Sequence, residues 1–124
     1  MRVRLTWLRG EAVLILDPGA TAERVAAALP AAATAHRWGD EVYFHLPVSV
    51  RLDADATDVV APGTVCYWVE GASIAIPFGP TPASLADECR LVTRVNSIGR
   101  LEGDPRLLVT LAEGDRLELA PETA

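Results

Sequence analysis

The chain opens with two short strand-like runs, residues 3–8 and 11–16, and charged and apolar residues alternate where the first begins. Alternation with a period of two is typical of a β-strand that buries one face. Arg9 and Gly10 separate the two runs, and Gly10 supplies the turn. The pattern therefore predicts an antiparallel hairpin at the start of the chain.

A helical period follows a break at residues 17–19, which read Asp-Pro-Gly. Thr21 is expected to cap this helix, with Glu23 placed favourably in its first turn. Pro30 ends the pattern. Four apolar residues at i, i+3, i+4 and i+7 then share one helical face: Ala22, Val25, Ala26 and Leu29.

Most of the remaining chain reads as short strands bounded by Gly and Pro turns. Residues 33–37 and 41–45 flank Trp38-Gly39-Asp40 as a hairpin, and further strands are expected at 64–69, 73–78, 91–101 and 116–119. Short helical turns can begin at Thr81-Pro82 and at Asp104-Pro105, the second continuing to about Leu111. Seven or eight strands with one good helix predict a mainly β fold, a closed or nearly closed antiparallel eight-stranded barrel with one or two short helices.

Composition is consistent with one globular domain spanning residues 1–124, since half of the residues are hydrophobic and 23% are charged. The net charge of −6 argues against binding nucleic acid through its phosphates. No run approaches the roughly 18 apolar residues of a membrane span, and the first residues lack the apolar core of a signal peptide. We therefore expect a cytoplasmic protein that binds neither nucleic acid nor membrane.

All eleven Lys and Arg residues are Arg, and the chain has no Gln. The bias is typical of a GC-rich genome, and the absence of Lys excludes Schiff-base chemistry within this chain. Cys66 and Cys89 do not form a CxxC pair, so two reduced thiols are expected, with a disulfide as the alternative.

Charged and aromatic residues are most concentrated in residues 36–44, which read His-Arg-Trp-Gly-Asp-Glu-Val-Tyr-Phe. Aromatic faces beside charges are typical of a small binding pocket and also of a well-capped hairpin. The Arg37 guanidinium can hold a carboxylate or carbonyl of a ligand, or form a salt bridge to Asp40 or Glu41. His36 can act as an acid or base near neutral pH, or donate a structural hydrogen bond.

Adjacent rings on the predicted strands, Tyr43-Phe44 and Tyr67-Trp68, must point to opposite faces of the sheet. One ring of each pair should fill the core, and the other should face outward or into a pocket. Asn96 is the only Asn in the chain and is expected to make either a structural hydrogen bond to a loop or a pocket contact. The candidate ligand-binding residues are His36, Arg37, Trp38, Glu41, Tyr43, Trp68, Phe78, Thr81 and Asn96.

Other chemistries lack support in the sequence. No serine lies in a Gly-x-Ser-x-Gly context, and no glycine-rich phosphate loop is present. His36, His45, Cys66, Asp40 and Glu41 do not have the spacing of metal ligands, so neither a metal nor a cofactor is expected.

Several segments resemble cyclophilins. The hairpin and helix of residues 4–29 are similar to the opening of that family, and residues 97–104, Ser-Ile-Gly-Arg-Leu-Glu-Gly-Asp, resemble its late strand and helical turn. Residues 36–44 and 78–82, the second reading Phe-Gly-Pro-Thr-Pro, resemble a small prokaryotic branch of cyclophilin-like proteins. Members of that branch are minimal eight-stranded barrels with no assigned biochemical role.

The resemblance implies a prolyl-isomerase site in which an Arg stabilises the twisted X-Pro amide, with Arg37 of the His36-Arg37 pair as the matching residue. Ala35 stands where the family motif has Phe, and the family's Gln-containing segments are absent. The preferred hypothesis is therefore a binding domain for a small molecule or a short, proline-containing peptide, with Arg37 and the aromatic side chains lining its cleft. A divergent peptidyl-prolyl isomerase and a protein-interaction module remain alternatives, and self-association is left open.

Overall fold

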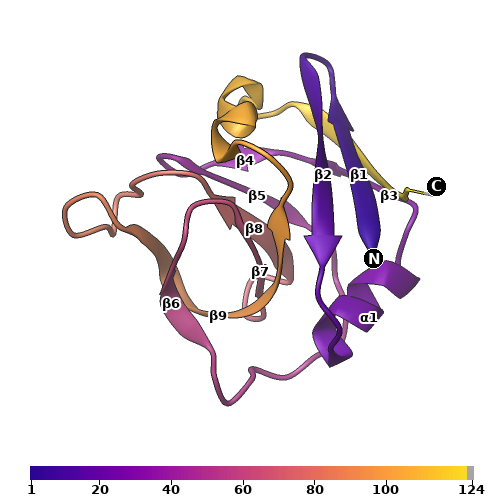
Figure 1. Ribbon diagram of the computed structural model, residues 1–124, viewed down its shortest axis with the longest axis horizontal. Coiled ribbons are helices and arrows are strands. Elements are labelled where there is room, and N and C mark those ends of the chain that lie inside the picture. Colours follow the sequence, from indigo (N-terminus) through magenta and orange to yellow (C-terminus); the bar gives the residue numbers. More distant parts are fainter. Residues whose placement is uncertain (123–124) are drawn as a thin grey trace.

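Ten strands form an antiparallel sheet that curves into a barrel in the computed structural model, which describes residues 1–122 (Figure 1). This confirms the fold class predicted from the sequence. The strands are β1 (Arg2–Trp7), β2 (Gly10–Leu16), β3 (Ala31–Thr34), β4 (His36–Arg37), β5 (Glu41–His45), β6 (Thr57–Val60), β7 (Thr64–Trp68), β8 (Ser73–Pro77), β9 (Cys89–Leu101) and β10 (Arg116–Pro121). Helix α1 (Ala20–Ala27) and the 3₁₀ helix η1 (Pro105–Thr110) lie on opposite sides of the molecule in Figure 1.

One continuous segment, residues 31–37, closes the barrel. Its first part, β3, pairs with β10, and its second part, β4, pairs with β5, so the two ends of the strand order β3-β10-β1-β2-β9-β7-β8-β5-β4 meet at Ala35. The Ala35 N–H donates to the Asp115 carbonyl at 2.8 Å, and the Ala35 carbonyl accepts from the Gly114 N–H at 2.8 Å. The backbone groups at the seam are therefore satisfied, and Ala35 is fully buried.

The alternation read from the sequence is present in β1, in β2 from Ala12 and in β10 up to Ala120, where every second residue is buried. Val3, Leu5, Leu14 and Leu119 are at most 1% exposed and belong to the main hydrophobic core inside the barrel. Burial of such side chains is the main favourable term for folding.

Strand β8 differs because all five of its residues are buried, on both faces. Ile74 and Ile76 point into the main core, while Ala75 belongs to a second, smaller core with Cys66, Leu91 and Val95. The outer face of the β5–β8–β7 part of the sheet is therefore covered by the first half of β9.

Strand β6 was not predicted from the sequence, and it pairs with β9 through an irregular register. Thr57 lies opposite Val95 while Val59 lies opposite Arg90, so residues 91–94 of β9 form a bulge. The split of residues 31–37 into β3 and β4 and the presence of β6 account for the two strands beyond the eight expected.

Two local predictions were wrong. Helix α1 begins after Gly19 without a side-chain cap, and Thr21 lies inside its first turn, where the hydroxyl accepts from Asn96 Nδ2 at 3.1 Å. The first hairpin turn consists of Leu8 and Arg9, because Gly10 belongs to β2 and pairs with Trp7. After Thr81 the chain makes one hydrogen-bonded turn, Ser84 N–H to Thr81 carbonyl at 3.0 Å. No helix among residues 1–122 is long and apolar enough to cross a membrane.

Candidate ligand-binding site

A cavity of about 160 Å³ lies on the outer face of the barrel, between the β5–β8–β7 sheet and the bulge of β9. Period-two alternation explains its position: Val42 and Phe44 of β5 face the main core, so Glu41 and Tyr43 face outward. The side chains that line the cavity are Trp38, Glu41, Tyr43, Trp68, Ala75, Leu91, Val92 and Val95.

The floor of the cavity is open because Ala75 is small. Ala75 is the register partner of both Tyr43 on β5 and Cys66 on β7, so it lies between larger side chains of the two neighbouring strands. Trp68 lies two residues beyond Cys66 on the same face of β7. A longer side chain at position 75 would fill the space between Tyr43 and Trp68.

Two aromatic walls meet at a right angle. The rings of Tyr43 and Trp68 have centroids 6.1 Å apart and an interplanar angle of 90°. Tyr43 also packs against the His36 ring at 5.1 Å, and His36 Nδ1 lies 2.8 Å from Glu113 Oε2. The position of the Tyr43 ring is therefore supported from the side opposite Trp68.

Glu41 is the only carboxylic acid among the lining residues, and its side chain is buried, with the residue 5% exposed. Its Oε1 atom has no hydrogen-bond partner within residues 1–122. Burial raises the pKa of Glu41 from 4.5 to about 8, because the charged form loses its hydration without gaining a partner. At neutral pH the carboxyl is therefore mostly protonated.

Trp68 supplies a second polar atom without a partner. Its Nε1 is buried and makes no hydrogen bond within the part of the chain that the structure describes. Buried polar groups in proteins are nearly always hydrogen-bonded, and an exception commonly marks a place for water or a ligand. Here both residues that carry such an atom, Glu41 with Oε1 and Trp68 with Nε1, belong to the lining of one cavity.

Arg37 does not line this cavity. It lies opposite Val42 in the β4–β5 ladder, and its guanidinium lies over the ring of Phe78, 5.0 Å from the centroid. It donates to the carbonyls of Leu111 at 3.0 Å and Gly39 at 3.2 Å. A contact of 3.7 Å to Asp40 shows the salt bridge that the sequence suggested as its structural role.

The nine sequence-based candidates thus separate into groups. Trp38, Glu41, Tyr43 and Trp68 line the cavity, and His36 touches it only through the Tyr43 ring. The other four, Arg37, Phe78, Thr81 and Asn96, are not among the lining residues.

Asn96 is fully buried away from the cavity and uses its whole amide on the chain. Its Oδ1 accepts from the Asp53 N–H at 2.7 Å, and its Nδ2 donates to the Arg51 carbonyl at 2.8 Å and to Thr21 Oγ1 at 3.1 Å. This is the structural contact to a loop that the sequence left open as one of two roles for Asn96.

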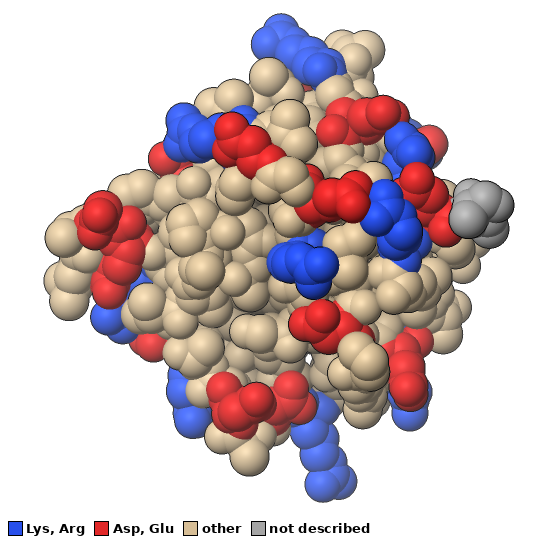
Figure 2. Space-filling view, viewed as in Figure 1, with Lys and Arg blue, Asp and Glu red and all other residues tan. Residues whose placement is uncertain are grey.

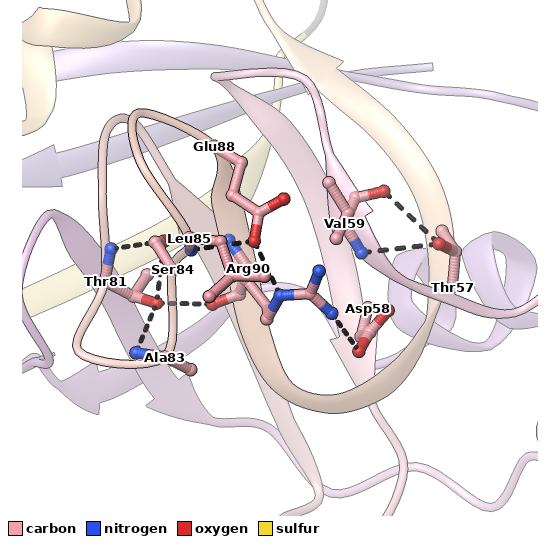
Figure 3. A network of polar contacts seen from close by, with 9 residues as sticks. All are labelled: Thr57, Asp58, Val59, Thr81, Ala83, Ser84, Leu85, Glu88 and Arg90. Atoms are coloured by element: carbon pink, nitrogen blue, oxygen red, sulfur yellow. Dashed lines mark hydrogen bonds and ion pairs between the residues drawn. The ribbon is translucent and has the colours of Figure 1, made fainter.

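Thr81 belongs to a network that anchors the loop before β9 (Figure 3). Its hydroxyl donates to the Arg90 carbonyl, and Arg90 itself contacts Glu88 at 2.7 Å and Asp58 of β6 at 2.8 Å. Arg90 directly precedes the bulge that carries Leu91 and Val92. The network therefore fixes the outer wall of the cavity on β9 rather than contributing to its lining.

Four lining residues were missed from the sequence, Ala75, Leu91, Val92 and Val95. The first lies in an apolar strand without visible alternation, and the other three depend on the β9 bulge. The apolar residues at positions 91, 92 and 95 were the only feature of the sequence that could have indicated this wall of the cavity.

The described residues offer no alternative metal or thiol site. Within residues 1–122 no three His, Cys, Asp or Glu side chains gather to hold a metal ion. Cys66 and Cys89 are both buried and free, and burial is the main cause that raises the pKa of each thiol. Charges of both signs are interspersed on the face in Figure 2, with uncharged surface between them.

Comparisons with known proteins agree on the fold. A family model described as Cyclophilin-like matches residues 1–120. The solution structure of a hypothetical protein from Archaeoglobus fulgidus is similar, with 35% sequence identity and a TM-score of 0.81 over 98% of this chain and 95% of that chain. No curated protein matches the sequence.

Proposed function

Because this chain belongs to the cyclophilin-like family, whose barrel it forms, we propose that it is a binding domain that takes a small molecule or a short peptide segment in the outer-face cavity. The observation that carries the proposal is that two residues lining one apolar cavity, Glu41 and Trp68, each hold a buried polar atom, Oε1 and Nε1, without a partner in residues 1–122.

The energetic argument rests on those two atoms. A buried donor or acceptor without a partner costs about 1–3 kcal/mol, which a bound ligand can recover by hydrogen bonding. Apolar walls with a few polar groups are typical of small-molecule sites. One water needs roughly 10–15 Å³ of such volume, so about 160 Å³ admits a group several times larger.

A ligand screen tests the proposal. We expect at least one fragment from a library of neutral, cationic and anionic small molecules and proline-containing dipeptides to bind in saturation-transfer NMR. Ala75→Leu, which fills the floor of the cavity, should weaken that binding at least tenfold because the space between Tyr43 and Trp68 is lost.

Ala32→Leu is the matched control, since it makes the same substitution at an exposed position of β3. It should leave fragment binding unchanged. A library without a single binder, or a binder whose affinity is equal in wild type and Ala75→Leu, would contradict the proposal.

The isomerase alternative would use Arg37, whose guanidinium is already held by the Leu111 and Gly39 carbonyls and the Phe78 ring. We therefore expect wild-type protein and Arg37→Ala to leave the cis–trans relaxation of a proline-containing peptide at its uncatalysed rate, in a protease-coupled assay. If the wild-type protein accelerates this relaxation and Arg37→Ala abolishes the acceleration, the protein is a prolyl isomerase and the proposal of a binding domain is wrong.

A further inference from the structure

The cavity combines one carboxyl group with three aromatic side chains and no basic residue in its lining. We propose that its ligand is an organic ammonium ion, with the positive charge beside Glu41 and the alkyl substituents against Trp38, Tyr43 and Trp68. This inference rests on the proposed function, because it names the chemical class of the ligand for the same cavity.

The aromatic side chains favour a cation. The face of a Trp or Tyr ring carries negative potential and attracts a cation within about 6 Å of its centroid. The rings of Tyr43 and Trp68 stand at 90° with centroids 6.1 Å apart, so they form two walls of a corner, and Trp38 contributes a third aromatic side chain to the lining. Alkyl groups on a nitrogen also bury apolar surface against Leu91 and Val92.

Glu41 supplies the opposite charge. Its Oε1 is buried and has no hydrogen-bond donor among residues 1–122, and a carboxylate in that position lacks the counterion that makes burial tolerable. An ammonium ion provides this counterion, whereas an anion would be repelled.

The groups packed around Glu41 do not replace the ligand. Asp40, its neighbour in the turn, is paired with Arg106 at 3.2 Å and lies 3.7 Å from Arg37. From β7 and β9, the thiols of Cys66 and Cys89 have pKa values raised mainly by burial and further by the charge of Glu41.

On the remaining side, the His36 ring packs on Tyr43 and its Nδ1 faces Glu113. The phenol of Tyr43 itself lines the cavity. Arg37 and Arg106 both lie beside the Asp40 carboxylate, and neither lines the cavity. Glu41 is therefore the single charged group among the lining residues.

The ionisation of Glu41 gives this proposal a distinctive pH dependence. In the free protein burial raises the pKa of Glu41 to about 8, so below that pH an ammonium ion must displace a proton to bind. The dissociation constant should therefore fall by up to about tenfold per unit as the pH rises toward 8, and level off above it. A neutral molecule of the same shape gains nothing from ionised Glu41.

The test titrates the protein with choline and with 3,3-dimethylbutan-1-ol, in which carbon replaces the charged nitrogen, at pH 6, 7, 8 and 9. Binding is followed by tryptophan fluorescence, since two of the three Trp residues line the cavity. We expect choline affinity to rise at least tenfold from pH 6 to pH 9 and to exceed that of the neutral alcohol at pH 9.

Glu41→Gln should remove the rise with pH, and Glu70→Gln, at an exposed glutamate, should retain it. If Glu41→Gln does not fold, the comparison of choline with the alcohol on wild type decides alone. Equal or tighter binding of the alcohol at pH 9, or no choline binding while other fragments bind, would contradict the proposal of an ammonium ligand. Either result would leave the proposed binding function standing. No binding of any fragment in the NMR screen overturns both.

Discussion

Between pH 4 and pH 9 the wild-type protein should lose on the order of 4 kcal/mol of unfolding free energy relative to Glu41→Gln. The cause is the pKa of Glu41, which burial raises from 4.5 to about 8 in the folded protein. The folded state therefore holds the proton more tightly than the unfolded chain. This contribution is fully present below about pH 4.5, is lost progressively up to about pH 8, and changes no further above it, whereas Gln has no proton to lose.

The measurement is urea unfolding of both proteins, without ligand, at intervals across this range. Taking the difference between wild type and variant cancels the titration of the groups that do not interact with Glu41. Glu70→Gln is the control, and its difference from wild type should be flat because Glu70 is exposed. A flat difference for Glu41→Gln as well would show that the Glu41 carboxyl is hydrated or paired. The proposal that a ligand binds beside an unpartnered Glu41 would then lose its support.

The fold was largely accessible from the sequence because alternation and turn residues are local signals. The hairpin of β1 and β2 follows from the period of two, although its turn is Leu8-Arg9 and Gly10 lies in β2. The aromatic segment around Trp38 follows from the Gly39 turn. Strand β6 was missed because its sequence, Thr-Asp-Val-Val, does not alternate between apolar and polar residues. In the structure all four residues are half-buried, so the strand has no clearly buried face.

The site was accessible only in part. Alternation required that one ring of each pair, Tyr43-Phe44 and Tyr67-Trp68, leave the core, and in the structure Tyr43 and Trp68 line the cavity. It could not decide which face of β4 carries the site, and so Arg37, which lies over the ring of Phe78, was given a ligand-binding role.

The wall of the cavity formed by β9 was not predicted from the sequence, because its position depends on tertiary structure. Leu91 and Val92 reach it through a bulge in β9 whose register is set by pairing with β6, more than thirty residues earlier in the chain. The anchor of that bulge, Arg90, bonds to Asp58 across the same pair of strands. Neither partner can be identified from local periodicity, because a bulge breaks the pattern from which strands are read.

Asn96→Leu is expected to lower the unfolding free energy by about 3 kcal/mol. The substitution keeps a side chain of similar size but leaves the Asp53 N–H, the Arg51 carbonyl and the Thr21 hydroxyl without the partner that Asn96 provides. Asn96 and Thr21 are buried, whereas the bonds to the Asp53 N–H and the Arg51 carbonyl are part-buried and come from exposed loop residues.

Asn96 is important because it is one of two buried side chains that hold the long connection between β5 and β6. The other is Tyr67. The Tyr67 hydroxyl donates to the Leu46 carbonyl at 2.9 Å and accepts from the Val48 N–H at 3.1 Å near its start, and Asn96 binds its middle. Losing Asn96 should therefore also speed hydrogen exchange at the Asp53 amide more than at amides of β1.

Two controls separate the amide from its surroundings in urea unfolding. Thr21→Val removes one of the three bonds and should cost about 1 kcal/mol, while Ser97→Ala, at the exposed neighbouring position, should cost almost nothing. A cost for Asn96→Leu no larger than that of Thr21→Val would mean that the two backbone bonds contribute little. In that case packing of the loop, rather than the Asn96 amide, would hold residues 51–53 against β9 and α1.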